Sequence, residues 1–111
     1  MSRLVERLRS LPLARLAAAI EPGAASRGDL ARDLAQHLAD VAAAIEGRPV
    51  RAIPRLSDEY AGDQVAVTAR DLAAAVGHGG ALGGGGDGVH DDIANRLADC
   101  IARVRELRLA L

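Results

Sequence analysis

"SRGDLARDLAQHLADVAAAIEGRP", residues 26–49, contains both ends of one amphipathic helix. Ser26 and Asp29 have the spacing of an N-terminal capping box, with aspartate in place of the usual glutamate. Gly47 and Pro49 are typical of the residues that end a helix. Between these ends the apolar stripe consists of Leu30, Leu34, Leu38, Val41 and Ile45. This stretch predicts a helix over 26–46 that buries one face.

Upstream, residues 2–20 have helical periodicity, but they contain Pro12. Proline removes a backbone donor and clashes with the preceding turn, so we expect a kink or two short helices there. The periodicity also changes at this point. One face carries Leu4, Leu8 and Leu11, and a second face, about half a turn away, carries Leu13, Leu16, Ala17 and Ile20.

Downstream, residues 47–62 read GRPVRAIPRLSDEYAG, and two prolines keep them out of a regular helix. The apolar residues Val50, Ile53 and Leu56 recur every third position, as in polyproline II. We expect an extended strap that lays these three side chains on the helices. The basic residues Arg48, Arg51 and Arg55 would then point elsewhere.

Two more helices follow. The first is predicted over 63–76, with a stripe of Val65, Ala69, Leu72 and Val76. A start at Ser57, with a weak point at Gly62, is an alternative. A competing interpretation makes "QVAV" a short strand, with Thr68 capping a helix. We prefer one continuous helix because such a strand would have no partner.

The last helix is predicted over 90–109, and charge and periodicity support it. Its acidic first turn and basic last turns match the helix dipole. Its stripe consists of Val89, Ile93, Leu97, Cys100, Ile101, Val104, Leu107 and Leu111.

Residues 77–88 contain eight of the twelve glycines and predict a loop between these helices. Gly83, Gly85 and Gly88 satisfy G-x-G-x-x-G, but a dinucleotide fingerprint joins a strand to a helix, and no strand is predicted here. We interpret the glycines as a flexible tether.

The expected fold is therefore all-α: a single domain over 1–111, built as a bundle of four to five helices. The net charge of −1 gives no general attraction to nucleic acid or anionic membranes. No apolar run is long enough to span a membrane. The single cysteine, Cys100, fits a reducing compartment. The absence of lysine beside 14 basic residues indicates a GC-rich, bacterial genome, and we expect a cytoplasmic protein.

Three sets of polar residues are candidates for metal or reactive sites. Asp33, His37 and Asp40 share one side of the helix over 26–46 and form a candidate metal site. His78 and His90 flank the glycines and form a second candidate pair. Cys100 falls within an apolar stripe, where a thiol is inert. For each set a structural role remains the preferred interpretation, and no cofactor is expected.

Residues 67–77, VTARDLAAAVG, resemble the first helix and turn of bacterial helix-turn-helix repressors. In that family a capping threonine precedes Asp-Leu-Ala, and a glycine marks the turn. The resemblance implies a recognition helix within about three or four residues. Residues 78–89 intervene here instead, and the next predicted helix begins with acidic residues.

These observations favour a non-catalytic module that binds a protein partner or self-associates. The expected interaction residues are Val50, Ile53, Leu56, Arg48, Arg51 and Arg55. Leu109, which points away from the main stripe of the last helix, is one of the observations that favour such a module. Two alternatives remain open: a DNA-binding regulator with a degenerate helix-turn-helix, and a metal-binding protein that uses Asp33, His37 and Asp40.

Overall fold

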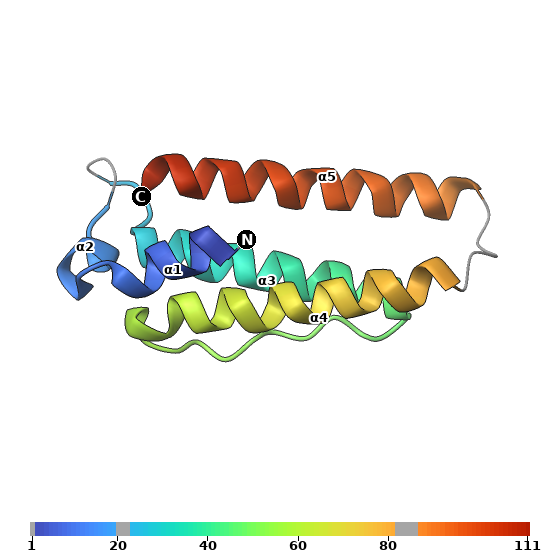
Figure 1. Cartoon of the computed structure of the whole chain (residues 1–111), viewed down its shortest axis with the longest axis horizontal. Helices are drawn as coiled ribbons and strands as arrows, with labels where there is room; N and C mark the ends of the chain where they lie inside the picture. The colour runs from blue at the N-terminus through green and yellow to red at the C-terminus, as the bar shows by residue number, and fades with distance from the viewer. Residues whose placement is uncertain (1, 20–22, 82–86) are drawn as a thin grey trace.

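A computed structural model of the chain describes residues 2–19, 23–81 and 87–111, and within them it is all-α, with no β-strand (Figure 1). Five α-helices and one short 3₁₀ turn follow one another along the chain. They are α1 (Ser2–Ser10), α2 (Leu13–Ala17), α3 (Arg27–Glu46), η1 (Asp58–Tyr60), α4 (Ala61–Ala81) and α5 (Asp87–Ala110). The all-α prediction is confirmed.

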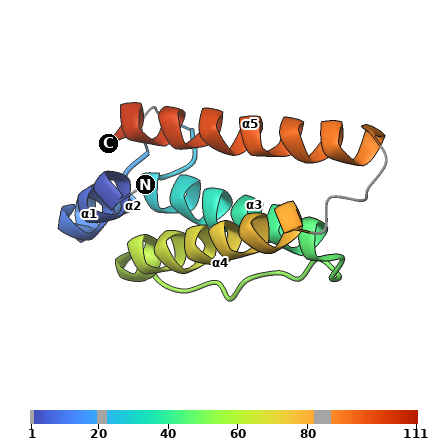
Figure 2. The same cartoon turned by 45° about the vertical axis from the view of Figure 1, so that its right-hand side comes forward.

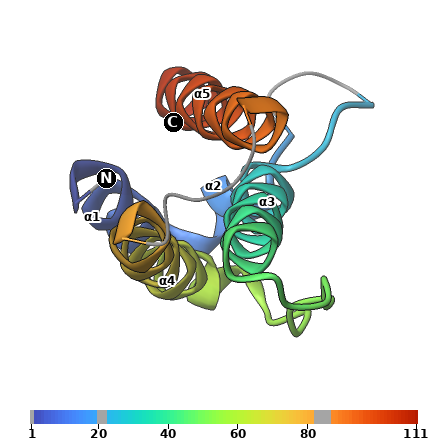
Figure 3. The same cartoon turned by 90° about the vertical axis from the view of Figure 1, so that its right-hand side faces the viewer.

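Helices α3 and α4 lie side by side and run in the same direction, whereas α1 and α5 run against them (Figures 1 and 2). α1 packs on α4, and α5 packs mainly on α3. The view along the bundle shows α3 between α5 and α4 (Figure 3). The strap leaves the end of α3 and returns along the outer side of α3 and α4 to the start of α4.

Helix α3 is the centre of the bundle, and its ends are those predicted from the sequence. The Ser26 hydroxyl accepts a hydrogen bond from the Asp29 amide at 3.0 Å. Gly47 ends the helix with φ of 68°, a left-handed conformation that glycine adopts without strain. Its buried positions are Gly28, Ala31, Leu34, Ala35, Leu38, Val41, Ala42 and Ala43. The buried side chains of α3 are therefore a mixture of small and large ones. The small ones allow neighbouring helices to approach α3 closely on several sides.

At the N-terminal end, α1 stops at Ser10 and α2 starts at Leu13, with Pro12 immediately before it. The predicted first face is buried, since Leu4, Leu8 and Leu11 are at most 8% exposed. The second predicted face is largely wrong. Of its described members only Leu16 is buried, while Leu13 and Ala17 are exposed and Ile20 lies outside the described residues. The short helix α2 therefore contributes a single side chain, that of Leu16, to the core.

Helix α4 is longer at both ends than the predicted 63–76, and α5 starts at Asp87 rather than at residue 90. The expected loop over 77–88 is therefore not confirmed: residues 77–81 and 87–88 are helical, and 82–86 lie outside the described residues. Adding a residue to an existing helix costs less free energy than starting a new helix. The ends of α4 and α5 can therefore include glycines that would not start a helix on their own.

Two predicted stripe positions are exposed. Val76 of α4 is 42% exposed, and its place in the core is taken by Ala75, which is fully buried. Ile101 of α5 is 56% exposed because it lies at the edge of a stripe whose centre, Cys100 and Leu107, faces the bundle. Among the described helices, none combines the length and apolar character that crossing a membrane requires.

The position of α3 leads to a stability prediction. Leu38→Ala is expected to lower the free energy of unfolding by about 2–5 kcal/mol, because Leu38 is 1% exposed and its removal leaves a cavity. Urea denaturation followed by circular dichroism measures this change. Leu109→Ala, at a site 89% exposed, is the control and is expected to change the value by about 0.5 kcal/mol or less. Equal losses in the two variants would contradict the assignment of the core.

Candidate protein-interaction surface

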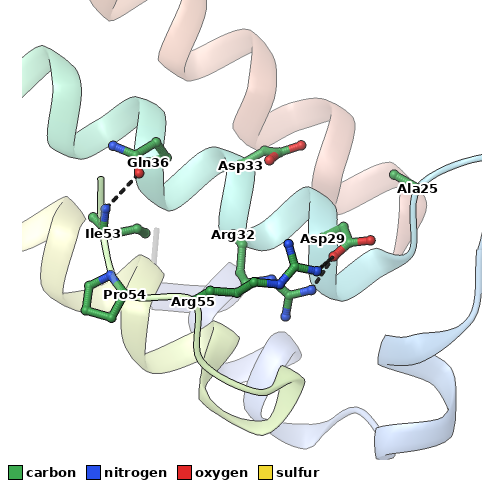
Figure 4. A pocket seen from close by; sticks show the side chains of 8 residues that line it. All are labelled: Ala25, Asp29, Arg32, Asp33, Gln36, Ile53, Pro54 and Arg55. Atoms are coloured by element: carbon green, nitrogen blue, oxygen red, sulfur yellow. Dashed lines mark hydrogen bonds and ion pairs between the residues drawn. The ribbon is translucent and has the colours of Figure 1, made fainter. Parts of the chain in front are cut away.

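The strap predicted over 47–62 is extended only over residues 48–57, and the prediction is wrong for 58–62, which are helical. From here on the strap means residues 48–57, and the side-chain amide of Gln36 holds it against α3. Gln36 Nε2 donates to the carbonyl of Arg51 at 2.9 Å, and Gln36 Oε1 accepts from the Ile53 amide at 2.8 Å (Figure 4). The single side-chain amide of Gln36 thus pairs with one backbone N–H and one backbone carbonyl of the strap, as the backbone of a neighbouring β-strand would. This pairing fixes the middle of the strap in position.

Helix α4 holds the strap from its other side. Gln64 Nε2 donates to the carbonyl of Pro54 at 2.7 Å, and Gln64 is 9% exposed. Its Oε1 is buried without a hydrogen-bond partner among the described residues. The strap is therefore pinned between a glutamine of α3 and a glutamine of α4.

A charged cluster closes the end of the strap. Arg32 of α3 pairs with Asp29 and, at 2.5 Å, with Asp58 of η1, and its side chain is only 13% exposed. The exposed guanidinium of Arg55 lies 3.6 Å from the same Asp29 carboxylate. A Cβ on Gly28 would collide with the Asp58 carboxylate, so glycine is needed for this close approach.

The hydrogen bond from Arg32 lowers the pKa of Asp29 below its ordinary value of 3.8. Desolvation by burial opposes this effect, and the Ser26 hydroxyl and the charge of Arg55 add to it. The cluster therefore favours the charged form of Asp29 and ties α3, η1 and the strap together.

Two hollows open on either side of the strap, and Ile53 and Pro54 line both of them. We call the first the polar hollow. It measures about 400 Å³ and is lined by Ala25, Asp29, Arg32, Asp33, Gln36, Ile53, Pro54 and Arg55 (Figure 4). We call the second the strap groove. It measures about 340 Å³ and is lined by Ala39, Ile53, Pro54, Leu56, Tyr60, Asp63, Gln64, Val67, Thr68 and Asp71.

The strap groove is the more apolar of the two, and it exposes large side chains. Leu56 is 41% exposed, Tyr60 46% and Val67 55%. Two carboxylates lie at its border. Asp63 pairs with Arg9 at 2.6 Å, whereas Asp71 makes no ion pair with any described residue. The groove therefore offers apolar surface next to a carboxylate that forms no ion pair within the described part of the chain.

The structure separates the three apolar residues predicted to pack together. Only Ile53 is half-buried and packs against the core, while Val50 is 59% exposed. Ile53 and Leu56 line the strap groove. The expectation that all three lie on the bundle is thus wrong for Val50 and Leu56. The side chains of Gln36 and Gln64, which we call the clamp, hold the strap by its backbone and not by these apolar side chains.

The three predicted strap arginines take different roles. Arg48 pairs with Glu46 at 2.9 Å. Arg51 contributes its carbonyl to the Gln36 clamp and has an exposed side chain. Arg55 lines the polar hollow. They do not form one basic patch.

The candidate metal ligands Asp33, His37 and Asp40 are not brought together. His37 Nε2 lies 3.0 Å from Asp99 Oδ2 of α5, at an angle that makes no hydrogen bond. Asp40 accepts from Gln36 at 2.8 Å, and Asp33 lines the polar hollow. Within the described part of the chain no three His, Cys, Asp or Glu side chains form a metal-holding group. The side chains of His78 and His90 lie outside the described residues.

The remaining motif residues are structural. Cys100 is 5% exposed, and burial raises the pKa of its thiol. Thr68 lies inside α4, where its hydroxyl donates to the carbonyls of Gln64 and Val65. It does not cap a helix, which is the role of the threonine in the helix-turn-helix pattern. The continuous helix preferred over the "QVAV" strand is confirmed.

A signal for the strap groove is present in the sequence, although it lies outside the predicted core stripe of α4. Tyr60, Gln64, Val67 and Asp71 are spaced four, three and four residues apart, so they share one side of η1 and α4. This side differs from the stripe that packs in the core. Nothing in the sequence pattern indicates that Gln36 and Gln64 bind the strap, because polar side chains on a helix are usually in contact with solvent.

Comparisons with known proteins found no matching family model, no matching curated protein and no matching solved structure.

The clamp can be tested by hydrogen exchange. Gln36→Ala is expected to speed exchange of the Ile53 amide, because it removes the acceptor for that N–H. NMR measurement of exchange gives the rate residue by residue. Gln36→Glu keeps an acceptor but not the donor to Arg51, so it is expected to give an intermediate rate. An unchanged rate in Gln36→Ala would show that the strap does not depend on this side chain.

The lowered pKa of Asp29 predicts a pH-dependent effect of Asp29→Asn. The folded-state pKa lies below the unfolded value, so the stabilisation is present above pH 3.8 and lost as the pH falls through the folded pKa. Asp29→Asn should therefore lower stability at neutral pH and lower it by less at about pH 2. Denaturant titrations at both pH values measure the difference. Asp33→Asn, which removes no ion pair among the described residues, is the control, and equal effects of the two variants would contradict the prediction.

Proposed function

We propose that this chain is a non-catalytic protein-interaction module whose strap groove receives apolar side chains of a protein partner. The observation that carries the proposal is the groove itself, with Leu56, Tyr60 and Val67 partly exposed along its walls. Exposed apolar side chains gathered in a hollow are typical of binding sites, whereas single ones scattered over a surface are ordinary. A tyrosine at the site supports this, since aromatic residues are frequent among the residues that dominate binding energy.

The chemistry of the groove indicates what the partner presents. The apolar walls favour an aliphatic or aromatic side chain, whose burial contributes about 1.5–3 kcal/mol. Asp71 favours a neighbouring arginine or lysine, because it has no ion pair within the described residues. The partner would therefore carry an apolar residue next to a basic one.

The clamp supports the same proposal, because it fixes the groove before any partner arrives. Gln36, Gln64 and Arg32 hold the strap from three places, so Ile53 and Leu56 are positioned in advance. A site that is already ordered loses less conformational entropy on binding. The buried, free Cys100 is consistent with a reducing compartment, and we place the module in the bacterial cytoplasm.

The test uses Tyr60, which is the only aromatic residue of the chain and lines the groove. Peptides without tyrosine or tryptophan are selected from a random library by binding to the whole chain. We expect the selected peptides to combine apolar and basic residues and to change the Tyr60 fluorescence. Titration of this signal gives the dissociation constant.

Two valines of α4 provide matched variants. Val67 lines the groove, whereas Val76, also exposed, does not. Val67→Glu should weaken peptide binding by about tenfold or more, since it places a charge against apolar surface. Val76→Glu should bind as the unchanged chain does. Equal binding to both variants, or failure to select any peptide, would overturn the proposal.

A further inference from the structure

The last turns of α5 present an exposed apolar residue that the fold does not use. Leu109 is 89% exposed, the largest exposure among the large apolar side chains that the structure describes. Arg105 lies one turn earlier on the same side of α5, and Arg108 precedes Leu109 directly. Both arginines are exposed and make no ion pair with the described residues. An apolar side chain and unpaired positive charges are thus displayed together.

This end of α5 is held firmly to the rest of the molecule. Arg27 Nε donates to the carbonyl of Ala110 at 2.9 Å, and Arg7 Nη2 donates to the carbonyl of Leu111 at 2.8 Å. Leu107, two residues before Leu109, is 3% exposed and faces the core. The helix end is therefore anchored by α1 and α3, and Leu109 projects outward from an ordered element. Presentation from an ordered element reduces the entropy lost on binding.

The strap groove has complementary chemistry and spacing. On α4 the apolar Val67 and the negative Asp71 are one helical turn apart, and both line the groove. On α5 the positive Arg105 and the apolar Leu109 are also one turn apart. Each element therefore pairs an apolar residue with a charge at the same spacing, and the charges have opposite sign.

Within one molecule these two surfaces cannot meet. The strap follows the outer side of α3 and α4, whereas α5 lies on the opposite side of α3 (Figures 1 and 3). The groove and the end of α5 consequently face away from each other.

We propose that the partner of the strap groove is a second copy of this chain, whose Leu109 enters the groove while its Arg105 faces Asp71. This inference rests on the proposed function, namely that the groove receives an apolar side chain of a protein. Because the two contacting surfaces differ, the association is head to tail and leaves a free groove and a free Leu109 at its ends. A single leucine and an exposed ion pair give weak, salt-sensitive association.

Sedimentation velocity over a range of protein concentrations and salt concentrations tests the inference. The unchanged chain should sediment faster as concentration rises, and added salt should reverse this. Leu109→Ser and Val67→Glu should each remain monomeric at every concentration. Ile101→Ser, at another exposed site of α5, and Val76→Glu are matched controls and should associate as the unchanged chain does. Circular dichroism checks that each variant is folded.

Mixing the two monomeric variants gives the decisive result. Leu109→Ser retains an intact groove and Val67→Glu retains an intact Leu109, so an equimolar mixture should form a dimer and nothing larger. Charge reversal supplies a second readout: Arg105→Glu should weaken association, and combining it with Asp71→Arg should restore it.

Each contrary outcome overturns the inference in a recognisable way. A monomer at all concentrations rules out a second copy as the partner, while peptide binding detected by Tyr60 would leave the proposed function standing. Loss of association in Ile101→Ser, with none in Leu109→Ser, would place the contact on another face of α5. A mixture that stays monomeric would contradict head-to-tail association.

Discussion

The parallel arrangement of α3 and α4 is the constraint on which the rest of the structure depends. Two parallel helices require the chain to return along the full length of the first, which for the 20 residues of α3 is about 30 Å. Residues 48–57 cover this distance because an extended chain rises about 3.3 Å per residue. Such a return segment has no strand beside it, so its backbone groups need side-chain partners. Gln36, Gln64 and Arg32 provide them.

The return of the strap along α3 and α4 also forms the surface to which we assign the proposed function. The strap lies over two helices, so it leaves one hollow toward α3 and another toward α4. Their chemistry differs because α3 supplies Asp29 and Arg32 on its side, whereas η1 and α4 supply Tyr60 and Val67. The same segment that closes the fold thus forms the rim of an apolar groove. Packing and the proposed binding site have one physical origin.

Local features of the structure could be predicted from the sequence, and long-range ones could not. The ends of α3 were predictable because Ser26 and Gly47 act within a few residues of their own position. The direction of α4 relative to α3 depends on how the strap crosses, which no local pattern encodes. The pairing of Gln36 with Ile53 joins residues far apart in the chain, and its donor and acceptor look like any solvated side chain.

The strap illustrates the same limit for the candidate site. A three-residue apolar repeat predicted that Val50, Ile53 and Leu56 pack together, but Ile53 is only half-buried and Val50 is exposed. The helical spacing of residues in the segment 60–71 places the groove-lining residues on one side of η1 and α4. The sequence pattern does not show that the strap lies next to them. The exposed position of Leu109 was predictable because it depends only on the periodicity of α5.

The clamped strap can be observed directly from nuclear Overhauser effects in solution. A strap held by the two glutamines should give cross-peaks between the side-chain amide protons of Gln36 and the Ile53 amide, and between those of Gln64 and the ring of Pro54. Absence of both sets of cross-peaks, in a chain whose sequential helical cross-peaks over α3 and α4 are intact, would contradict the clamp.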